Sequence, residues 1–202
     1  MMYRIFFDKY FAAQSQPIAV HKTNPEVNNI EHDHDFEELV IVDRGSGTHI
    51  LNGEPIAIQT GDVFYIQRQD YHYYENMGSL SLTNILLRDD IKFINIPSLH
   101  QVLTNTFAEA SSSIYRLNLE YRATYNQLIQ QLSETLNQQD PLVTVRREGL
   151  LLQLISLLSF HRVRAQPTRS HSGIEQLLDE IRLRHTGEIN WDALCEKYAI
   201  SQ

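Results

Sequence analysis

Three histidines and a glutamate recur at a spacing that constrains this chain more than any other feature. His32, His34 and Glu38 are separated by even numbers of positions, and His72 follows on a later apolar segment. Because side chains of an extended strand alternate between its two faces, the first three can point to the same side of a sheet. His72 can supply a fourth group from a neighbouring strand. The set predicts a cavity that binds a divalent metal, a polar small molecule, or both.

Short strands separated by turn signals are predicted for residues 1 to about 95. Residues 38–42 form an apolar strand, and residues 48–58 form a hairpin around Asn52-Gly53, because both turn residues tolerate positive φ. A further turn at Gly61-Asp62 leads into the next strand. Strands of this length and spacing predict a closed or sandwich-like antiparallel barrel.

From residue 119 the apolar period changes to that of a helix, and Pro141 suits the first turn of a second helix. The second helix contains the run 150–158, which is apolar on more than one face and must therefore be covered on more than one side. The barrel can cover one face, and we predict that a second copy of the chain covers the other. A thick intramolecular core is the alternative. The predicted dimer contacts are Leu150, Leu154, Leu157 and Leu158.

The last part of the chain has a different composition. Residues 163–172 are polar and basic and contain a proline, which indicates a linker. Residues 173–202 predict two short amphipathic helices that would bury too little surface for an independent domain. We therefore expect this tail to be an incomplete domain.

Composition narrows the class of protein. A length of 202 residues with 42% apolar content allows one core with a helical extension. The net charge of −8 argues against a broad basic surface for nucleic acid. A single cysteine, Cys195, excludes an internal disulfide and fits a reducing cytoplasm. No apolar run approaches the roughly 20 residues of a membrane span, and no signal-peptide pattern opens the chain, so we predict a cytoplasmic protein without a membrane partner.

Several segments carry a resemblance to a known family. EHDHDFEELVIVDRGSGTHILNG, followed by TGDVFYI and LTNILLR, resembles the sensor domain of AraC/XylS-family transcription regulators, and within that family the L-rhamnose regulators. The histidine and glutamate spacing is similar to that of the two cupin motifs. EINWDALCEKYAIS resembles the start of the same family's DNA-binding domain, up to the first helix of its first helix-turn-helix.

The resemblance implies an all-β cupin, a double-stranded β-helix or jelly-roll barrel, followed by an α-helical hairpin and a short truncated helical tail. The implied parts are a cupin-type ligand-binding domain with an N-terminal arm at 1–110, a dimerisation hairpin at 111–162, a linker at 163–172, and an incomplete helix-turn-helix domain at 173–202.

The same resemblance implies a function. We expect the ligand-sensing and dimerisation portion of a regulator of sugar catabolism, with L-rhamnose as the effector, and not an enzyme. Lacking a recognition helix, this chain is expected not to bind DNA specifically, so promoter DNA would be a partner only of a full-length form. The alternative is a small metal-dependent cupin enzyme that acts on a sugar or a related polar metabolite.

The site prediction leaves two alternatives to metal binding: direct hydrogen bonding of a sugar without metal, and purely structural histidines. Ligand type does not distinguish Zn, Ni, Mn or Fe. The predicted metal ligands are His32, His34, Glu38 and His72. With them, the residues predicted to line the sugar site are Tyr65, Tyr74 and Asn84. His49 is predicted to lie on the surface, and Arg88 is predicted to be a solvated charge at a strand end.

Overall fold

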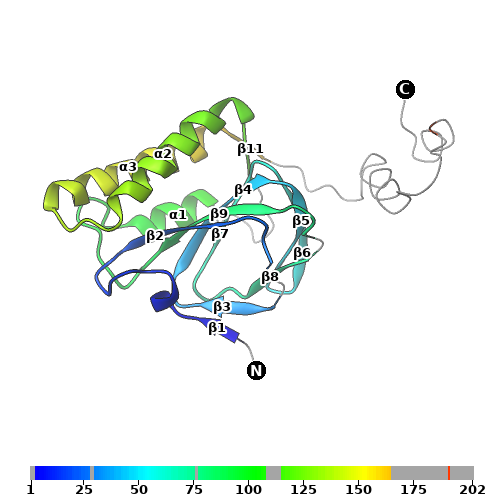
Figure 1. Cartoon of the computed structure of the whole chain (residues 1–202), viewed down its shortest axis with the longest axis horizontal. Helices are drawn as coiled ribbons and strands as arrows, with labels where there is room; N and C mark the ends of the chain where they lie inside the picture. The colour runs from blue at the N-terminus through cyan, green and yellow to red at the C-terminus, as the bar shows by residue number, and fades with distance from the viewer. Residues whose placement is uncertain (1–2, 28–29, 76, 108–114, 165–190, 192–202) are drawn as a thin grey trace. The chain divides into compact units, whose positions relative to one another are not determined.

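The computed structural model describes residues 3–27, 30–75, 77–107, 115–164 and 191. Residues 1–167 form one compact unit, and residues 168–202 form a second. In the first unit two β-sheets face each other, and three helices lie on the outer side of the larger sheet (Figure 1). The predicted fold, a cupin-type barrel followed by a helical hairpin, is confirmed. Of the predicted helical tail only Trp191 is among the described residues.

The larger sheet has the strand order β11-β10-β7-β4-β9-β2. Its strands in chain order are β2 (Ile18–Thr23), β4 (Glu37–Arg44), β7 (Asp62–Ile66), β9 (Ser81–Leu87), β10 (Tyr115–Leu117) and β11 (Arg162–Arg164). The smaller sheet has the order β1-β3-β8-β5-β6. Its strands are β1 (Tyr3–Ile5), β3 (His32–His34), β5 (Ser46–Leu51), β6 (Glu54–Gln59) and β8 (His72–Glu75). Single 3-10 turns occur at η1 (Phe7–Lys9) and η2 (Leu119–Tyr121).

Alternation along the central strands gives the larger sheet two apolar faces. One set of side chains, which includes Leu39 and Ile85, packs under the helices. The side chains at the alternate positions of the same strands, which include Val40 and Leu82, pack in the barrel interior with side chains from the smaller sheet. A sheet covered on both sides needs apolar residues at nearly every position, which explains the continuous run in β4.

The predicted hairpin is confirmed by β5 and β6, which pair antiparallel from Ser46↔Gln59 to Leu51↔Glu54. Asn52 and Gly53 form its turn with φ of 52° and 83°. Positive φ at both central positions matches the twist of the flanking strands.

The helices are α1 (Leu99–Phe107), α2 (Arg122–Thr135) and α3 (Pro141–Phe160). Pro141 occupies the first helical position of α3, as predicted, and the Asp140 side chain accepts hydrogen bonds from the backbone N–H groups of Leu142 and Val143. Strand β11 covers residues 163 and 164, at the start of the expected linker, and pairs with β10. The hairpin is thus followed by a strand of the larger sheet. Among the described residues, no helix has both the length and the apolarity to cross a bilayer.

The predicted dimer contacts need correction. Leu154 and Leu158 are fully buried within the single chain, and Leu150 is nearly so, in the core between α3 and the larger sheet. Leu157 is half-buried against the same core. For the three buried leucines the alternative prediction, an intramolecular core, is the correct one. Side chains that are already enclosed by their own chain have no surface left for a partner.

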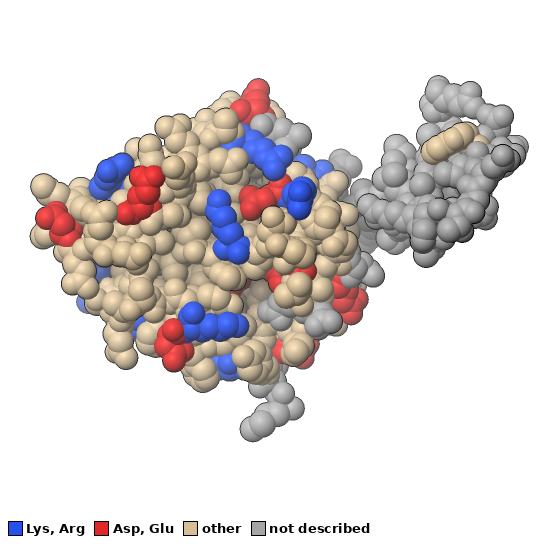
Figure 2. All heavy atoms as spheres, in the orientation of Figure 1, with Lys and Arg blue, Asp and Glu red and all other residues tan. Residues whose placement is uncertain are grey.

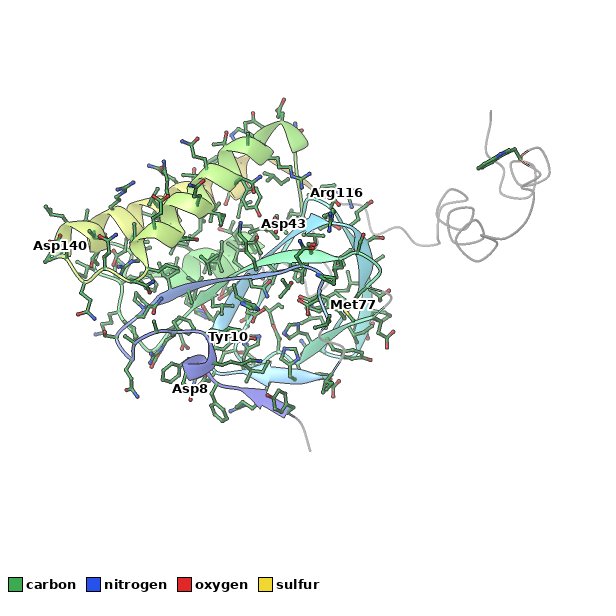
Figure 3. The ribbon with its side chains drawn as sticks, in the orientation of Figure 1. Asp8, Tyr10, Asp43, Met77, Arg116 and Asp140 are labelled. Carbon is green, nitrogen blue, oxygen red and sulfur yellow. The ribbon has the colours of Figure 1, made fainter. Side chains whose placement is uncertain are left out.

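Polar contacts fix the hairpin to the barrel beside this core. The Tyr125 hydroxyl donates to the Asp43 carboxylate, which also accepts a bond of 2.6 Å from the Thr83 hydroxyl. Asp43 lies where β4 approaches α2 (Figure 3). On α3, the buried Glu148 carboxylate accepts from the backbone N–H groups of Ile94 and Asn95 at 2.8 and 2.5 Å. Both contacts join α-helices to loops or strands of the barrel.

Charges are intermingled on the visible surface. On the face shown in Figure 2, lysine and arginine side chains lie among aspartates and glutamates and do not gather in one basic patch. Arg44 is exposed. Arg88, predicted to be solvated, is instead buried: its side chain pairs with the Asp90 carboxylate and donates to the Gln14 carbonyl. It holds the N-terminal segment against the end of β9.

Candidate functional site

A compact group of potential metal ligands lies inside the barrel. His34 from β3, Glu38 from β4 and His72 from β8 each offer one ligand atom, and these atoms all lie within 4.8 Å of one another. All three side chains are buried. Backbone pairing of His32 with His72 brings β3 beside β8, so residues far apart in sequence converge on one region.

The hydrogen bonds of the histidines leave the same ring nitrogen available on each. His34 Nδ1 donates to the Phe36 carbonyl oxygen at 2.5 Å, which makes Nε2 the lone-pair nitrogen. His72 Nδ1 lies 3.3 Å from His49 Nε2. Both His34 Nε2 and His72 Nε2 are buried without a hydrogen-bond partner among the described residues. A metal-binding histidine characteristically uses one nitrogen for the ion and the other for an orienting hydrogen bond. Both rings have an orienting partner on Nδ1 and an Nε2 that could bind an ion.

The distances fit an ion after small adjustments. His34 Nε2 lies 3.9 Å from Glu38 Oε1. Zinc–nitrogen and zinc–oxygen bonds of about 2.0–2.2 Å in a tetrahedral site separate neighbouring ligand atoms by about 3.3–3.6 Å. The His34–Glu38 pair would need to close by a few tenths of an ångström, and ligand atoms that lie as far as 4.8 Å apart would need to close by about 1 Å.

Burial keeps the cluster uncharged around neutral pH. Desolvation lowers the pKa of His34 to about 4 and lowers the pKa of His72 well below its usual value, with neighbouring histidines adding to the effect. Desolvation, with a contribution from Glu26, raises the pKa of Glu38 to about 8. A divalent cation would stabilise the carboxylate form of Glu38 and would bind neutral imidazoles without displacing protons from them.

His32 lies beside this cluster but outside the set of three converging atoms. Its ring centroid is 4.4 Å from that of His72, and its Nδ1 bonds the Ile30 carbonyl at 2.8 Å. Three of the four predicted ligands thus have ligand atoms within 4.8 Å of one another, and His32 contacts one of the three through its ring.

His49 is a residue that sequence analysis placed wrongly. It is buried in the barrel interior, not on the surface, and its ring stacks on Phe64 and Tyr74 with centroids 4.6 and 4.9 Å away. Its Nε2 is the partner of His72 Nδ1 and so orients that ring. The sequence could have indicated this, because side chains two positions apart on a strand point to the same face. His49 lies two positions from Leu51, whose side chain packs in the interior.

The three predicted sugar-lining residues divide between the two sides of the larger sheet. Tyr74 packs in the barrel interior, and Asn84 pairs in register with Val40, which also faces the interior. The Tyr74 hydroxyl and Asn84 Oδ1 are buried without partners among the described residues. Buried polar atoms of this kind are available to a polar guest.

Tyr65 does not line the interior. Its ring belongs to the core beneath the helices, and its hydroxyl lies 3.3 Å from His100 Nδ1 on α1. The same histidine nitrogen bonds the Glu37 carboxylate. Register explains the error: Tyr65 lies opposite Leu39, and both side chains face the helices.

This chain is similar to several known proteins. The family model for the AraC-like ligand binding domain matches residues 16–155. The transcriptional activator RhaS of Escherichia coli (strain SE11) is 32% identical over 192 residues, covering 95% of this chain and 69% of that protein. RhaS of Shigella sonnei (strain Ss046) is 31% identical over the same shares. Among solved structures, the AraC-like transcriptional activator CuxR matches 94% of this chain and 69% of that chain with 11% identity and a TM-score of 0.45.

The family match spans both the barrel that holds the histidine cluster and the helical hairpin, and the similarity to RhaS extends over nearly the whole chain. This chain belongs to the AraC-like ligand-binding domain family of transcription regulators.

Proposed function

We propose that this chain is the ligand-sensing and dimerisation portion of a cytoplasmic AraC-family regulator of sugar catabolism, with L-rhamnose as its effector. The observation that carries the proposal is the buried cluster of His34, Glu38 and His72 inside the barrel of a chain from this family. The resemblance to the L-rhamnose regulators supports the choice of sugar.

The cluster would hold a divalent metal such as Zn, Ni, Mn or Fe through His34 Nε2, His72 Nε2 and a Glu38 oxygen. The unpartnered Nε2 atoms support this assignment, since a buried nitrogen acceptor without a partner costs about 1–3 kcal/mol. A bound ion with open positions accepts hydroxyl oxygens, so it would supply an anchor for vicinal hydroxyls of a sugar. Tyr74 and Asn84 would bind further hydroxyls, and His32 would complete the polar wall.

The N-terminal arm offers a route from the barrel to the rest of the protein. Strand β1 pairs in parallel with β3, with Ile5 opposite His34. Phe36 stacks on the His34 ring at 4.7 Å and also contacts the Tyr10 and Phe11 rings of the arm. A ligand that moves β3 would therefore move the arm, and a coupling of about 1–3 kcal/mol is enough for allosteric control.

A different face of α3 supports the dimer. Leu142, Val145, Leu152 and Phe160 are exposed and share one face of the helix, which we call the α3 outer stripe. Gly149 lies within this stripe, and a Cβ added there would meet no atom within 4 Å. A two-fold axis near Gly149 would place Val145 of one copy beside Leu152 of the other, so the centre of the stripe is complementary to itself. The neighbouring outer face of α2 is polar, which leaves this stripe as the apolar surface of the hairpin.

Sedimentation tests the dimer. Leu152→Glu places a charge in the stripe without entering the core and should give a monomer. Gln127→Glu, on the exposed face of α2, is the matched control and should leave the mass unchanged. A dimer of unchanged affinity in Leu152→Glu would remove the α3 outer stripe from the interface.

Thermal unfolding with a panel of monosaccharides, with and without chelator, tests the sensor. A ligand at a hundredfold its dissociation constant stabilises the folded state by about 2.7 kcal/mol. L-Rhamnose should raise the midpoint of the metal-loaded protein, and both chelator and His34→Ala should abolish the rise. No shift with any sugar would contradict the proposal, and turnover of an aldose that is lost in Glu38→Ala would favour the metal-dependent enzyme instead.

A further inference from the structure

A cavity lies outside the barrel, between the N-terminal arm and the turn that joins α2 to α3. It has a volume of about 600 Å³ and shares no residue with the histidine cluster. Ala13 and Ser15 line it from the arm, and Gln139, Thr144 and Arg147 line it from the hairpin. Asp140, at the start of α3, marks this end of the hairpin in Figure 3.

Arg147 gives the cavity a buried cation that forms no ion pair with the described residues. Arg147 is only 5% exposed. Its Nη2 donates to the carbonyl oxygens of Thr135 and Gln138, both at 2.5 Å, and its Nε is buried with no hydrogen-bond partner. Among the described side chains, no carboxylate lies within ion-pair distance of Arg147. The adjacent Glu148 acts on Arg147 only through its charge, which partly offsets the desolvation that lowers the Arg147 pKa, while its carboxylate oxygens accept from two backbone N–H groups.

A buried charge is costly unless it is paired, and a guanidinium with free donors is a strong site for an oxyanion. Carbonyl oxygens satisfy part of its hydrogen-bonding capacity but carry no full negative charge. An anion in the cavity would supply the missing charge.

The other residues that line the cavity indicate which chemical groups the ligand carries besides its anionic group. Apart from Arg147 the residues that line the cavity are neutral, and Ser15 and Asn137 among them have hydroxyl and amide side chains. The Gln138 amide and the Thr144 hydroxyl already donate to the carbonyl oxygens of Glu134 and Asp140, so these two side chains offer chiefly their oxygen atoms, as acceptors. The volume falls within the roughly 300–1,000 Å³ of small-molecule sites and is far larger than a single phosphate needs. We propose that this cavity binds a small hydroxylated anion, a sugar phosphate or a sugar acid, with its anionic group on Arg147 and its hydroxyls on the amide and hydroxyl side chains.

The arm side of this site is already ordered by hydrogen bonds. Gln16 Oε1 accepts from the Ala12 N–H, and Gln16 Nε2 donates to the Ile18 carbonyl. Arg88 holds the Gln14 carbonyl. A bound anion would contact both the arm and the hairpin, and would therefore give the protein a second input that ties these two parts together.

Isothermal titration calorimetry of the 202-residue chain tests the site with glucose 6-phosphate, gluconate and neutral glucose. We expect at least one of the two anions to bind and glucose not to bind. Binding of glucose 6-phosphate alone would identify the phosphate class, and binding of gluconate alone the sugar acids. Ala13→Trp and Ser15→Trp fill the cavity without removing Arg147, and each should weaken the anion at least about tenfold. Gln14→Trp, an exposed neighbour that does not line the cavity, should bind like wild type.

Arg147→Gln should also abolish binding, with circular dichroism as the check on its fold, and His34→Ala should retain binding because the barrel cluster is not involved. The proposal is overturned if neither anion binds wild type, if glucose binds as tightly as the anions, or if both filled variants bind normally. Loss of anion binding in His34→Ala would place the ligand in the barrel and would equally overturn it.

Discussion

Truncation of Leu154 tests which face of α3 belongs to the core. Leu154 is fully buried against the larger sheet, whereas Leu152 is 40% exposed on the α3 outer stripe. Leu→Ala changes at fully buried positions cost about 2.7–5 kcal/mol, because transfer free energy is lost and a cavity remains. We expect Leu154→Ala to lower the free energy of unfolding by about 3–4 kcal/mol, and Leu152→Ala by less than about 1 kcal/mol. For a unit of this size, a loss of about 3–4 kcal/mol corresponds to a fall in the Tm of Leu154→Ala of roughly 6–16 °C.

Urea unfolding followed by far-UV circular dichroism measures both variants. Fluorescence is less suitable, because Trp191 is the only tryptophan and belongs to the second unit. All samples need the same protomer concentration, since dimerisation adds to apparent stability. A loss below about 1 kcal/mol for Leu154→Ala, or a larger loss for Leu152→Ala than for Leu154→Ala, would refute the packing of α3 described above.

Two further substitutions test the barrel and its junction with the hairpin. Tyr125→Phe removes the hydroxyl that donates to Asp43. We expect it to lower the free energy of unfolding by about 1.5–3 kcal/mol in the same urea assay, because the lost hydrogen bond is made to a charged group. No loss would show that this contact is replaced by water. Gly45 has φ of +85°, and an added Cβ would lie 2.7 Å from the Ser79 carbonyl oxygen. Gly45→Ala should therefore reduce soluble yield and Tm. Gly53→Ala, with φ of +83° and an added Cβ that would meet the Tyr71 hydroxyl at an ordinary contact distance of 3.8 Å, bears only the backbone strain of about 1–3 kcal/mol. Equal Tm values for the two variants would contradict the clash.

Strand periodicity made the barrel predictable from the sequence. Asn52 and Gly53 specified the hairpin locally, because their conformational tolerance is a property of the residues themselves. The convergence of His34, Glu38 and His72 was expected and is observed, but the even spacing of His34 and Glu38 is not its cause. His34 lies on β3 of the smaller sheet and Glu38 on β4 of the larger sheet, so the two side chains do not share one side of one sheet. They meet because the two sheets face each other, which is a long-range property that even spacing does not report.

Predictions that depended on register or on the choice between two faces were less successful. Tyr65 was placed in the barrel interior, yet its pairing opposite Leu39 turns it toward the helices, and a single sequence does not reveal that pairing. The same limit applies to α3, which is apolar on several sides, so periodicity alone did not distinguish Leu154 from Leu152. Only packing against α2 and the sheet separates the buried face from the exposed one.

Metal content measured by inductively coupled plasma mass spectrometry tests the central claim most directly. Wild type, His34→Ala and the control His161→Ala are purified without a metal-affinity column. The account predicts close to one divalent ion per chain in wild type and in the control, and a large loss in His34→Ala. Equal metal content in His34→Ala and wild type, or no bound metal in wild type, would contradict a metal centre formed by His34, Glu38 and His72.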